Sequence, residues 1–405
     1  MKLKLRFLLL FISMLLICQT ACGTSDDKAT ENDSNNSSQS STGQSEDDGS
    51  GAAADEAGDD GDETAQDTVD YDAAWKTFDK DFIVMTVNGE AVTWQEYYRW
   101  LYYIISYVED TSGAITDWSA PCAINRKYTI AEYAKRYAES TVAQYRVVKQ
   151  IAEEQNVTLT EEENKAIQDA WDKSVEEYGG EEAFLAYLKS GYSTRELYFF
   201  GQEVSYLYDD LFRSRYGENG ENCTDETVAA FAESNEYVRT QYLLLKTVDE
   251  DNMLLGEEKI QEKKDRIYAL SDEIAAAEDP IAKFGELYEQ YNEDSMASRY
   301  PDGYTRSLSS LSSSEVRTVL SQLPENSVSQ PVETGYGYYI LLRLPLDYDS
   351  IVEYDKKDHT PYTLRYIAAA ELFSDEIAET LASAEIHYSE ELKVLDLEQL
   401  FTSHS

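Results

Sequence analysis

The spacing of apolar residues predicts that the chain is mainly helical between residues 94 and 216. From Ile130 to Ala152 an apolar residue recurs every three or four positions, which is the period of one face of an α-helix. Thr93, Thr160 and Ser193 each stand three positions before a Glu, and such pairs form capping boxes at helix starts. The predicted helices cover residues 94–108, 130–152, 160–178, 181–189 and 193–216.

A short apolar run precedes this helical region. Residues Ile83 to Val87 are typical of a strand, and Asn88-Gly89 is typical of a tight turn. Because Ala91-Val92 is apolar again, we expect a β-hairpin directly before the first long helix.

Residues 236–346 show a mixed pattern of strand-like and helix-like stretches. The expected elements are a strand at 238–246, charged helical sequence to about 277, helices at 284–294 and 315–320, and a strand at 335–342. This order predicts a small α+β unit with an antiparallel sheet. The fold class expected for the whole chain is therefore α+β with a helical majority.

The last part of the chain, residues 347–405, begins with a linker after Pro345. A helix is expected at 363–383, followed by the short apolar segment Ile386-His387-Tyr388 and a closing segment at 392–401.

The first 22 residues have the pattern of an export signal. Three cationic residues precede an apolar run, residues 7–17, that is too short to span a membrane comfortably. Ala21 before Cys22 resembles a bacterial lipoprotein cleavage box, although Gln19 stands where such boxes usually carry Leu. Lipidation is expected at Cys22 rather than Cys18, which follows a large residue. The alternative is an ordinary cleaved signal with an incidental cysteine.

Residues 23–75 are predicted to be a disordered acidic tether. Within 23–72 there are 16 acidic residues and one lysine, with almost no apolar side chains to bury. The predicted organisation is a signal peptide at 1–22, the tether at 23–75, a helical module at 76–235, the mixed unit at 236–346 and a C-terminal part at 347–405.

Charge and composition exclude several classes of function. The chain carries a formal net charge of −45, and a nucleic-acid-binding face needs an excess of Lys and Arg instead. Only three histidines are present, and no phosphate-binding loop, dinucleotide fingerprint, catalytic triad or zinc spacing occurs. The sequence therefore predicts no nucleic-acid partner, no metal and no cofactor. Two cysteines, Cys122 and Cys223, lie in loop-like sequence and could form a disulfide outside the cytosol.

The order of motifs in the helical region resembles the SurA/PrsA-type chaperone module. The segment Val87 to Thr93 resembles its opening, and residues 144–163 are similar to its long helix, its link and its next helix. Residues 184–197 continue the match. In PrsA-like proteins the chain after the isomerase domain returns to complete this module, and the C-terminal part is similar in order.

The mixed unit resembles a parvulin-type peptidyl-prolyl isomerase domain. Phe284 to Asp294 is similar to the family's "F-x-x-L-A-x-x-Y-S-x-D" helix. The strongest match is Ser327 to Ile340, which is similar to "x-I-S-x-P-V-x-T-x-F-G-Y-H-I". The family's helix-ending Gly is replaced by Asn326, the next-best residue for a left-handed backbone.

The resemblance assigns a catalytic site with altered residues. The family's two core histidines fall at Tyr242 and Tyr339, while its acidic or thiol position is kept as Asp294. Its glycine-rich loop is replaced by residues 300–304. The substrate pocket is assigned to three further residues, with smaller side chains than usual at the first two: Leu311, Val316 and Tyr338.

Isomerisation about an X-Pro bond makes and breaks no covalent bond, so proton transfer is not required. The barrier of ~18–20 kcal/mol belongs to a twisted amide, which an apolar, dry site with polar groups near the carbonyl can stabilise. Tyr242 and Tyr339 could therefore donate hydrogen bonds as the imidazoles would, or could merely fill the core of an idle domain. Asp294 could equally be an ordinary solvated acid.

The predicted helix at 94–108 is aromatic on nearly every side. Either it packs in a core, or it forms a wall that binds client polypeptides. The client-binding residues of the second interpretation are Trp94, Tyr98, Trp100 and Tyr102.

Together the resemblances imply a lipid-anchored foldase at the outer face of the cytoplasmic membrane. Its partners would be unfolded exported polypeptides, and its activity would be peptidyl-prolyl cis-trans isomerisation with an altered site. One alternative is a holdase chaperone whose parvulin domain is only a scaffold. A second is a solute-binding lipoprotein, which would require two lobes of alternating strands and helices.

Overall fold

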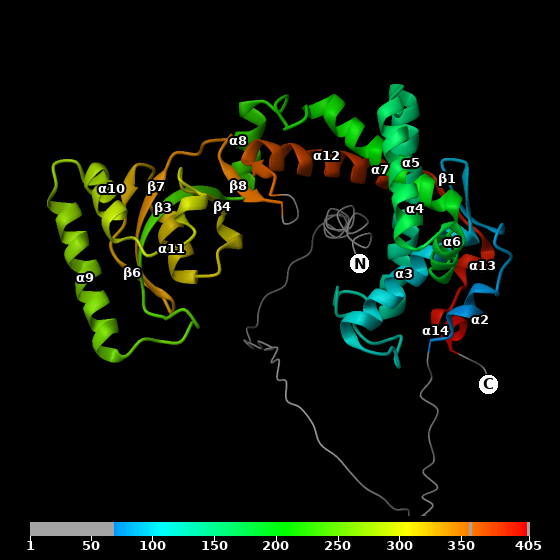
Figure 1. The fold of residues 1–405 in the computed structure, drawn as a ribbon, viewed down its shortest axis with the longest axis horizontal. Helices are drawn as coiled ribbons and strands as arrows, with labels where there is room; N and C mark the ends of the chain where they lie inside the picture. Colours follow the sequence, from blue (N-terminus) through cyan, green and yellow to red (C-terminus); the bar gives the residue numbers. More distant parts are fainter. Residues whose placement is uncertain (1–68, 356–358, 403–405) are drawn as a thin grey trace, which may run out of the picture. The chain divides into compact units, whose positions relative to one another are not determined.

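The computed structural model describes residues 69–355 and 359–402. The predicted signal peptide, the lipidation site Cys22 and most of the predicted tether lie outside the described residues. No helix within these two ranges is both long and apolar enough to cross a membrane. Helices and antiparallel sheets make up the structure, so the predicted α+β class is confirmed (Figure 1).

The chain divides into two compact units. Unit 1 contains the described residues up to Arg146, Ala170–Phe199 and the described residues from Ala382 onward, and unit 2 contains Val147–Asp169 and Phe200–Leu381. Four helices have residues in both units: α4 (Ile130–Gln155), α5 (Glu161–Glu177), α7 (Arg195–Tyr216) and α12 (Leu364–Ser383).

Unit 1 combines helices with a three-stranded antiparallel sheet of order β10-β1-β2. Its other elements are α2 (Tyr71–Trp75), β1 (Ile83–Val87), β2 (Glu90–Thr93), α3 (Trp94–Ser112), α6 (Glu181–Ser190), β10 (Ile386–Tyr388), α13 (Glu390–Lys393) and α14 (Leu397–Phe401). The predicted hairpin turn is present, with φ of 48° at Asn88 and 87° at Gly89. Strand β10 pairs with β1, so a segment almost 300 residues later completes this sheet.

Two of the three predicted capping boxes are present. Thr93 and Glu96 cap each other's backbone N–H groups at the start of α3, and Thr160 and Glu163 do the same before α5. The prediction for Ser193 was wrong. Its backbone N–H donates to the carbonyl of Leu188 and so belongs to the turn that ends α6. The hydroxyl of Thr194 accepts from Leu197 N instead, and α7 begins one residue later.

Unit 2 contains a five-stranded antiparallel sheet of order β4-β3-β7-β5, with β6 also paired to β7. The elements from α8 to α11 are α8 (Asp225–Ser234), β3 (Tyr237–Lys246), α9 (Glu257–Ala276), α10 (Pro280–Tyr291), η2 (Ala297–Arg299), β4 (Tyr304–Ser307), η3 (Leu308–Ser310) and α11 (Ser314–Gln322). The strands that follow are β5 (Ser327–Val328), β6 (Val332–Glu333), β7 (Gly337–Leu344), β8 (Ile351–Tyr354) and β9 (Pro361–Thr363). Helix α8 and strands β4, β8 and β9 were not predicted.

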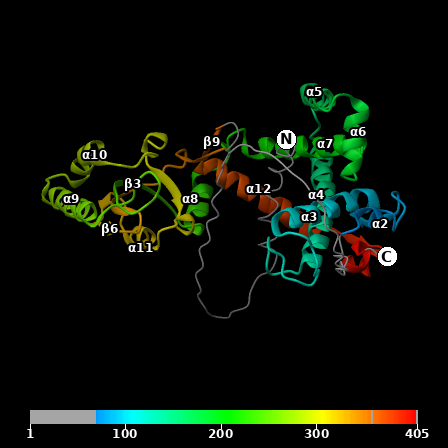
Figure 2. The same cartoon turned by 60° about the horizontal axis from the view of Figure 1, so that its bottom comes forward.

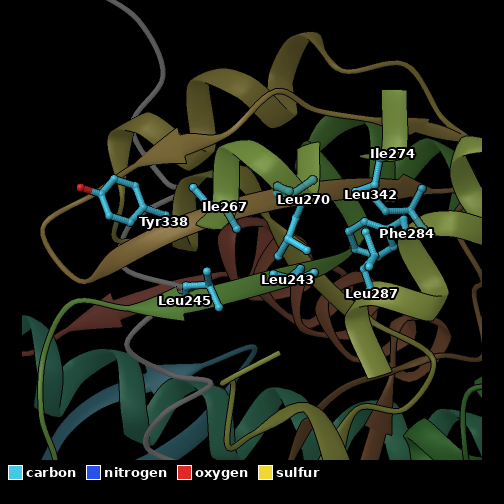
Figure 3. Close-up of a cluster of buried hydrophobic side chains, with 10 residues drawn as sticks. Leu243, Leu245, Ile267, Leu270, Ile274, Phe284, Leu287, Tyr338 and Leu342 are labelled. Atoms are coloured by element: carbon cyan, nitrogen blue, oxygen red, sulfur yellow. The ribbon is translucent and has the colours of Figure 1, made fainter. Parts of the chain in front are cut away.

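The two faces of this sheet carry different clusters of apolar side chains, because successive residues of a strand point to opposite faces. Helices α9 and α10 cover one face, where Leu243 and Leu245 of β3 pack with Phe284 and the even-numbered residues of β7 (Figures 1 and 3). Helix α11 covers the other face, which we call the α11 face; in Figure 2 it again lies away from α9 and α10. The odd-numbered residues of β7 point to the α11 face.

Two backbone positions at the starts of strands depend on the residue type: Asn326 directly before β5, and Gly337 as the first residue of β7. Asn326 has a φ of 57°, so the predicted left-handed conformation is confirmed. At Gly337 a Cβ atom would lie 2.5 Å from the carbonyl oxygen of Leu245 and 2.8 Å from Leu244 Cδ1. Only glycine therefore allows β3 and β7 to approach each other this closely.

Arg365, near the start of α12, joins the segments that lead into and out of the sheet. Its guanidinium donates to the carbonyl oxygen of Cys223 at 2.6 Å, to Asp225 at 2.7 Å and to Asp349 at 2.8 Å. The first and last strands are themselves neighbours, with Arg239 of β3 opposite Leu344 of β7.

Candidate functional site

Two of the predicted catalytic residues lie side by side on the α11 face of the sheet. In the antiparallel register Tyr242 stands opposite Leu341, and Leu244 stands opposite Tyr339, so both tyrosines point to the same face. Their ring centroids are 5.5 Å apart, with the planes inclined at 68°. The two positions that the resemblance assigns to histidines are therefore adjacent in space.

Asp294 is brought to these tyrosines by the polar segment that ends α10. The side chain of Asn292 accepts from Leu244 N at 2.9 Å, and Glu293 N donates to Leu244 O at 2.9 Å. These bonds fasten the segment to the middle of β3. One carboxylate oxygen of Asp294 then accepts from Met296 N at 3.0 Å, and the other accepts from the hydroxyl of Tyr304.

Tyr304, at the start of β4, is a member of the site that the sequence analysis missed. Its ring stacks on Tyr242 with centroids 4.8 Å apart and planes 9° apart, while its hydroxyl donates to Asp294. Tyr300 also contacts the ring of Tyr304, with the ring centroids 4.9 Å apart. Two large aromatic residues in a loop that the family fills with glycines are the signal that could have pointed to it.

The phenol groups of the site stay protonated well above neutral pH. Burial, the nearby charge of Asp294 and a hydrogen bond with Tyr304 raise the pKa of Tyr242 far above its usual value. Burial and the hydrogen bond to Asp294 raise the pKa of Tyr304. Burial, with smaller effects of Tyr336 and Asp294, raises the pKa of Tyr339 to about 12. The three groups therefore act as neutral hydrogen-bond donors.

The predicted pocket residues divide between the two faces of the sheet. Leu311 and Val316 are half-buried and pack with Tyr242 and Tyr339 against the cluster on the α11 face. The assignment of Tyr338 was wrong, because it is one residue out of phase with Tyr339. Tyr338 is 3% exposed and packs with Ile267 of α9 on the opposite face (Figure 3).

The resulting arrangement suits a prolyl amide better than a reaction that moves protons. Rings and aliphatic side chains provide an apolar surface for a pyrrolidine, and phenol hydroxyls and one carboxylate provide polar contacts. A twisted amide has lost its resonance, so its carbonyl and nitrogen respond to such fixed dipoles.

The aromatic residues predicted to bind clients are mostly in the core of unit 1. Trp94 and Tyr98 are completely buried, and Trp100 is 5% exposed with its ring against Tyr145. Client binding through these three side chains was therefore the wrong interpretation, and core packing is the correct one. Tyr102 is half-buried and contacts Tyr192 with ring centroids 5.0 Å apart.

The disulfide that the sequence left open between Cys122 and Cys223 is not present. Both are free thiols, and each is buried within its own unit. Among the residues that the structure describes, no three His, Cys, Asp or Glu side chains gather closely enough to hold a metal ion.

A comparison with protein-family models finds a match within the mixed unit, residues 236–346. Residues 243–344 match the family model described as "Rotamase: PPIC-type PPIASE domain". No curated protein matches the chain.

Several solved structures are similar at low identity. PrsA from Bacillus subtilis is 17% identical, covering 68% of this chain and 94% of that one, with a TM-score of 0.24. PrsA from Streptococcus pneumoniae is 17% identical, covering 67% and 93%, with a TM-score of 0.26. A third structure comes from a study of PEB4 and Cj1289, two SurA-like chaperones of Campylobacter jejuni. It is 13% identical, covering 76% of this chain and 99% of that one, with a TM-score of 0.21.

These TM-scores are too low to establish a common arrangement of the whole chains, so the assignment rests on the family match. That match covers the last four residues of β3, the other four strands of the sheet and the helices α9 to α11. It includes Asp294, Tyr304, Leu311 and Tyr339, and it begins one residue after Tyr242. The predicted resemblance to parvulin-type domains is confirmed for this part of the chain: residues 243–344 match the model of the PPIC-type rotamase family.

Proposed function

We propose that this protein is an extracytoplasmic foldase whose parvulin-type domain isomerises X-Pro bonds in exported polypeptides. The observation that carries the proposal is the cluster of Tyr242, Tyr304, Tyr339 and Asp294 on the α11 face of a PPIC-type domain. Its members are neutral donors and one carboxylate, held against an apolar surface.

In the proposed mechanism the client proline packs against Leu311, Val316 and the tyrosine rings. The prolyl amide is then twisted while the phenol groups of Tyr242 or Tyr339 hydrogen-bond to its carbonyl oxygen, and Asp294 keeps Tyr304 fixed. Catalysis follows because these contacts are stronger to the twisted amide than to either planar isomer. The histidines of the family are not needed, since no proton is transferred.

The proposed location rests on the N-terminal sequence alone. A cationic start, a short apolar run and Ala21-Cys22 support export and lipidation of Cys22, and two acyl chains suffice for stable attachment. The acidic residues 23–75 would then hold the folded part away from the membrane surface.

The decisive experiment is a proline-limited refolding assay with the chain from residue 22 onward, carrying Cys22→Ser. We expect acceleration that Tyr339→Phe weakens about tenfold or more, as expected when a polar contact to the transition state is removed. Asp294→Asn should weaken it similarly, because Tyr304 is then no longer held by a carboxylate. Asp272→Asn is the matched control, because Asp272 is an exposed carboxylate on α9, on the other side of the sheet.

A holdase with an idle parvulin domain is the second candidate, favoured by the dense tyrosine packing at the site. It predicts no acceleration of refolding but suppressed aggregation of the unfolded client. If both site variants still accelerate refolding, the proposed site is rejected. If the wild type neither accelerates refolding nor suppresses aggregation, the foldase proposal as a whole is rejected.

A further inference from the structure

A small hairpin follows β3 and leads into α9. Residues 248–254, which we call the acidic hairpin, fold back with an antiparallel bridge between the first and the last of them (Figure 1, near the lower end of α9). The carboxylate of Asp249 accepts from the N–H groups of Asp251 at 3.0 Å and Met253 at 2.9 Å. The N–H of Asp249 donates to the carbonyl oxygen of Met253 at 2.9 Å. These bonds fix the turn, and the proposed mechanism does not use it.

The acidic hairpin holds two large apolar side chains in solvent. Met253 is 65% exposed and Leu254 is 68% exposed. Within residues 69–355 and 359–402, the one large apolar side chain with greater exposure is Val394. A single exposed apolar side chain is ordinary, but two neighbours on a fixed turn indicate a contact surface. The flexible thioether of methionine adapts to partners of different shape.

Tyr336 connects the acidic hairpin to the tyrosine site. Its carbonyl oxygen accepts at 3.0 Å from the N–H of Thr247, the residue directly before the hairpin. Its ring centroid lies 5.6 Å from Lys246 Nζ, and it is one of the nearby groups that raise the pKa of Tyr339. Tyr336 is 38% exposed and Lys246 is half-buried, so the surface between the two sites is accessible.

The separation of the two sites corresponds to a few residues of extended polypeptide. Tyr339 stands opposite Leu244, and the hairpin begins four residues after Leu244, which is about 13 Å along a strand. Helix α11 does not lie in this direction at its C-terminal end, because the carbonyl oxygen of Leu320 accepts from Arg343, opposite the first half of β3. An extended segment of about four residues would therefore reach from Tyr339 to the hairpin.

The charge of the hairpin indicates which partner it fits. Asp249, Glu250 and Asp251 are consecutive, and all three are exposed. They attract a Lys or Arg side chain that lies next to an apolar residue on Met253 and Leu254. A second copy of this chain, with its formal net charge of −45, would be repelled.

We propose that the acidic hairpin is a client-docking surface, which selects an apolar residue next to a basic one about four residues from the client's proline. The apolar side chain packs on Met253 and Leu254, and the basic side chain faces Glu250 and Asp251. The proposal rests on the proposed function, since it takes the tyrosine site as the position of the proline. The substrate class is thus an unfolded segment with a proline and a nearby apolar–basic pair.

The test measures binding directly, so that it does not depend on catalysis. Three fluorescein-labelled peptides contain one Ala-Pro bond in a Gly/Ser background. One has Leu-Lys four and five residues before the proline, one has Leu-Lys at the same separation after it, and the comparator has neither. With the chain from residue 22 carrying Cys22→Ser, fluorescence anisotropy should give a dissociation constant about tenfold lower for one Leu-Lys peptide than for the comparator.

Matched pairs of substitutions identify the apolar contact. Met253→Ser with Leu254→Ser should reduce the tenfold preference to less than twofold. Ile281→Ser with Val394→Ser removes apolar side chains from two other exposed positions and should leave the preference unchanged. Circular dichroism checks that each variant is folded.

A second comparison identifies the charged contact. Replacing the peptide's lysine by glutamine should raise the dissociation constant about threefold at low salt, which is typical of an exposed ion pair. Glu250→Gln with Asp251→Asn should abolish this difference. Asp272→Asn with Glu273→Gln removes the same charge from exposed positions on α9 and should preserve it.

The outcomes separate this proposal from the proposed function. No preference in the wild type, or a preference that Met253→Ser with Leu254→Ser leaves intact, overturns the docking surface. A lysine effect that Glu250→Gln with Asp251→Asn leaves intact overturns the assignment of the basic residue. If the refolding assay shows no isomerase activity while the hairpin variants still remove the preference, the isomerase proposal fails and the hairpin stands as a chaperone contact.

Discussion

The hydrogen bond from Tyr304 to Asp294 leads to a sharp prediction about a single residue. Tyr304→Phe keeps the ring that stacks on Tyr242 and removes only the hydroxyl. We expect kcat/KM on a proline peptide to fall about tenfold, because Asp294 then no longer fixes the ring that stacks on Tyr242. Tyr268→Phe on the exposed surface of α9 should leave kcat/KM unchanged. Equal activity of both variants would show that Tyr304 only fills space.

The raised pKa of Tyr339 predicts a loss of stability at alkaline pH. Between pH 10 and about 12 the unfolded state releases this proton and the folded state keeps it, so stability falls as pH rises. Since Tyr339 is partly exposed, we expect the wild type to lose about 2 kcal/mol more than Tyr339→Phe over this range. Urea denaturation at pH 9, 10, 11 and 12 measures the difference. Parallel pH curves for the two proteins would contradict this prediction.

Single residues also show where prediction from the sequence succeeds and where it fails. Asn326 was predicted correctly, because few residues other than glycine adopt positive φ and the position was clear from the motif. Tyr338 was misplaced, because a shift of one residue reverses the face of a strand. Tyr304 was missed because its partner Asp294 comes from another segment, and only the fold brings the two together.

At the level of secondary structure, Arg146 of α4 holds the hairpin and the start of α3. It pairs with Glu96 at 2.6 Å and donates to the carbonyl oxygen of Ala91 at 2.9 Å, and the side chains of the ion pair are only 10% and 16% exposed. Arg146→Met should destabilise unit 1 by about 3 kcal/mol, because it leaves a mostly buried carboxylate unpaired.

Tryptophan fluorescence can measure this change in unit 1 alone. All five tryptophans of the chain lie in that unit, at positions 75, 94, 100, 118 and 171. Lys127→Met, at an exposed position in the same unit, should leave the denaturation midpoint where it is. A similar midpoint for Arg146→Met and the wild type would mean that the pair contributes little.

The contact between β3 and β7 gives the matching prediction for unit 2. Gly337→Ala would place a Cβ 2.5 Å from Leu245 O and should cost about 2–3 kcal/mol, whereas Gly335→Ala meets nothing within 4 Å. Near-ultraviolet circular dichroism of the tyrosines should follow the loss, while the tryptophan transition of unit 1 stays unchanged. Equal effects of the two substitutions would show that the strands can move apart at little cost.

Long helices and strands were easier to predict from the sequence than short ones. The longest helix, α4, carried a clear helical period, and β3 was recognisable as an apolar run. Strand β4 has only four residues, Tyr-Thr-Arg-Ser, and forms because β3 offers it a free edge. Pairing of this kind is a tertiary effect, which a local pattern does not contain.

For the whole molecule, the acidic charge predicts which clients bind best. With a formal net charge of −45, the protein should suppress aggregation of a denatured basic protein better than that of an acidic one. Raising NaCl from about 0.1 to about 1 M shortens the screening length from ~10 to ~3 Å and should remove most of that difference. Light scattering measures aggregation in each case. A preference that persists at high salt would assign it to apolar contacts instead.

The first and last strands of the five-stranded sheet in unit 2, β3 and β7, are neighbours, and Arg365 joins the segments that flank them. Neighbouring strands are about 4.8 Å apart, so the chain leaves the domain close to the point where it enters. It therefore has the geometry of a removable cassette: residues 237–344 could be excised and the cut ends joined by a few glycines. Relatives of this protein could lose or exchange the domain in a single genetic event without rebuilding the helices around it.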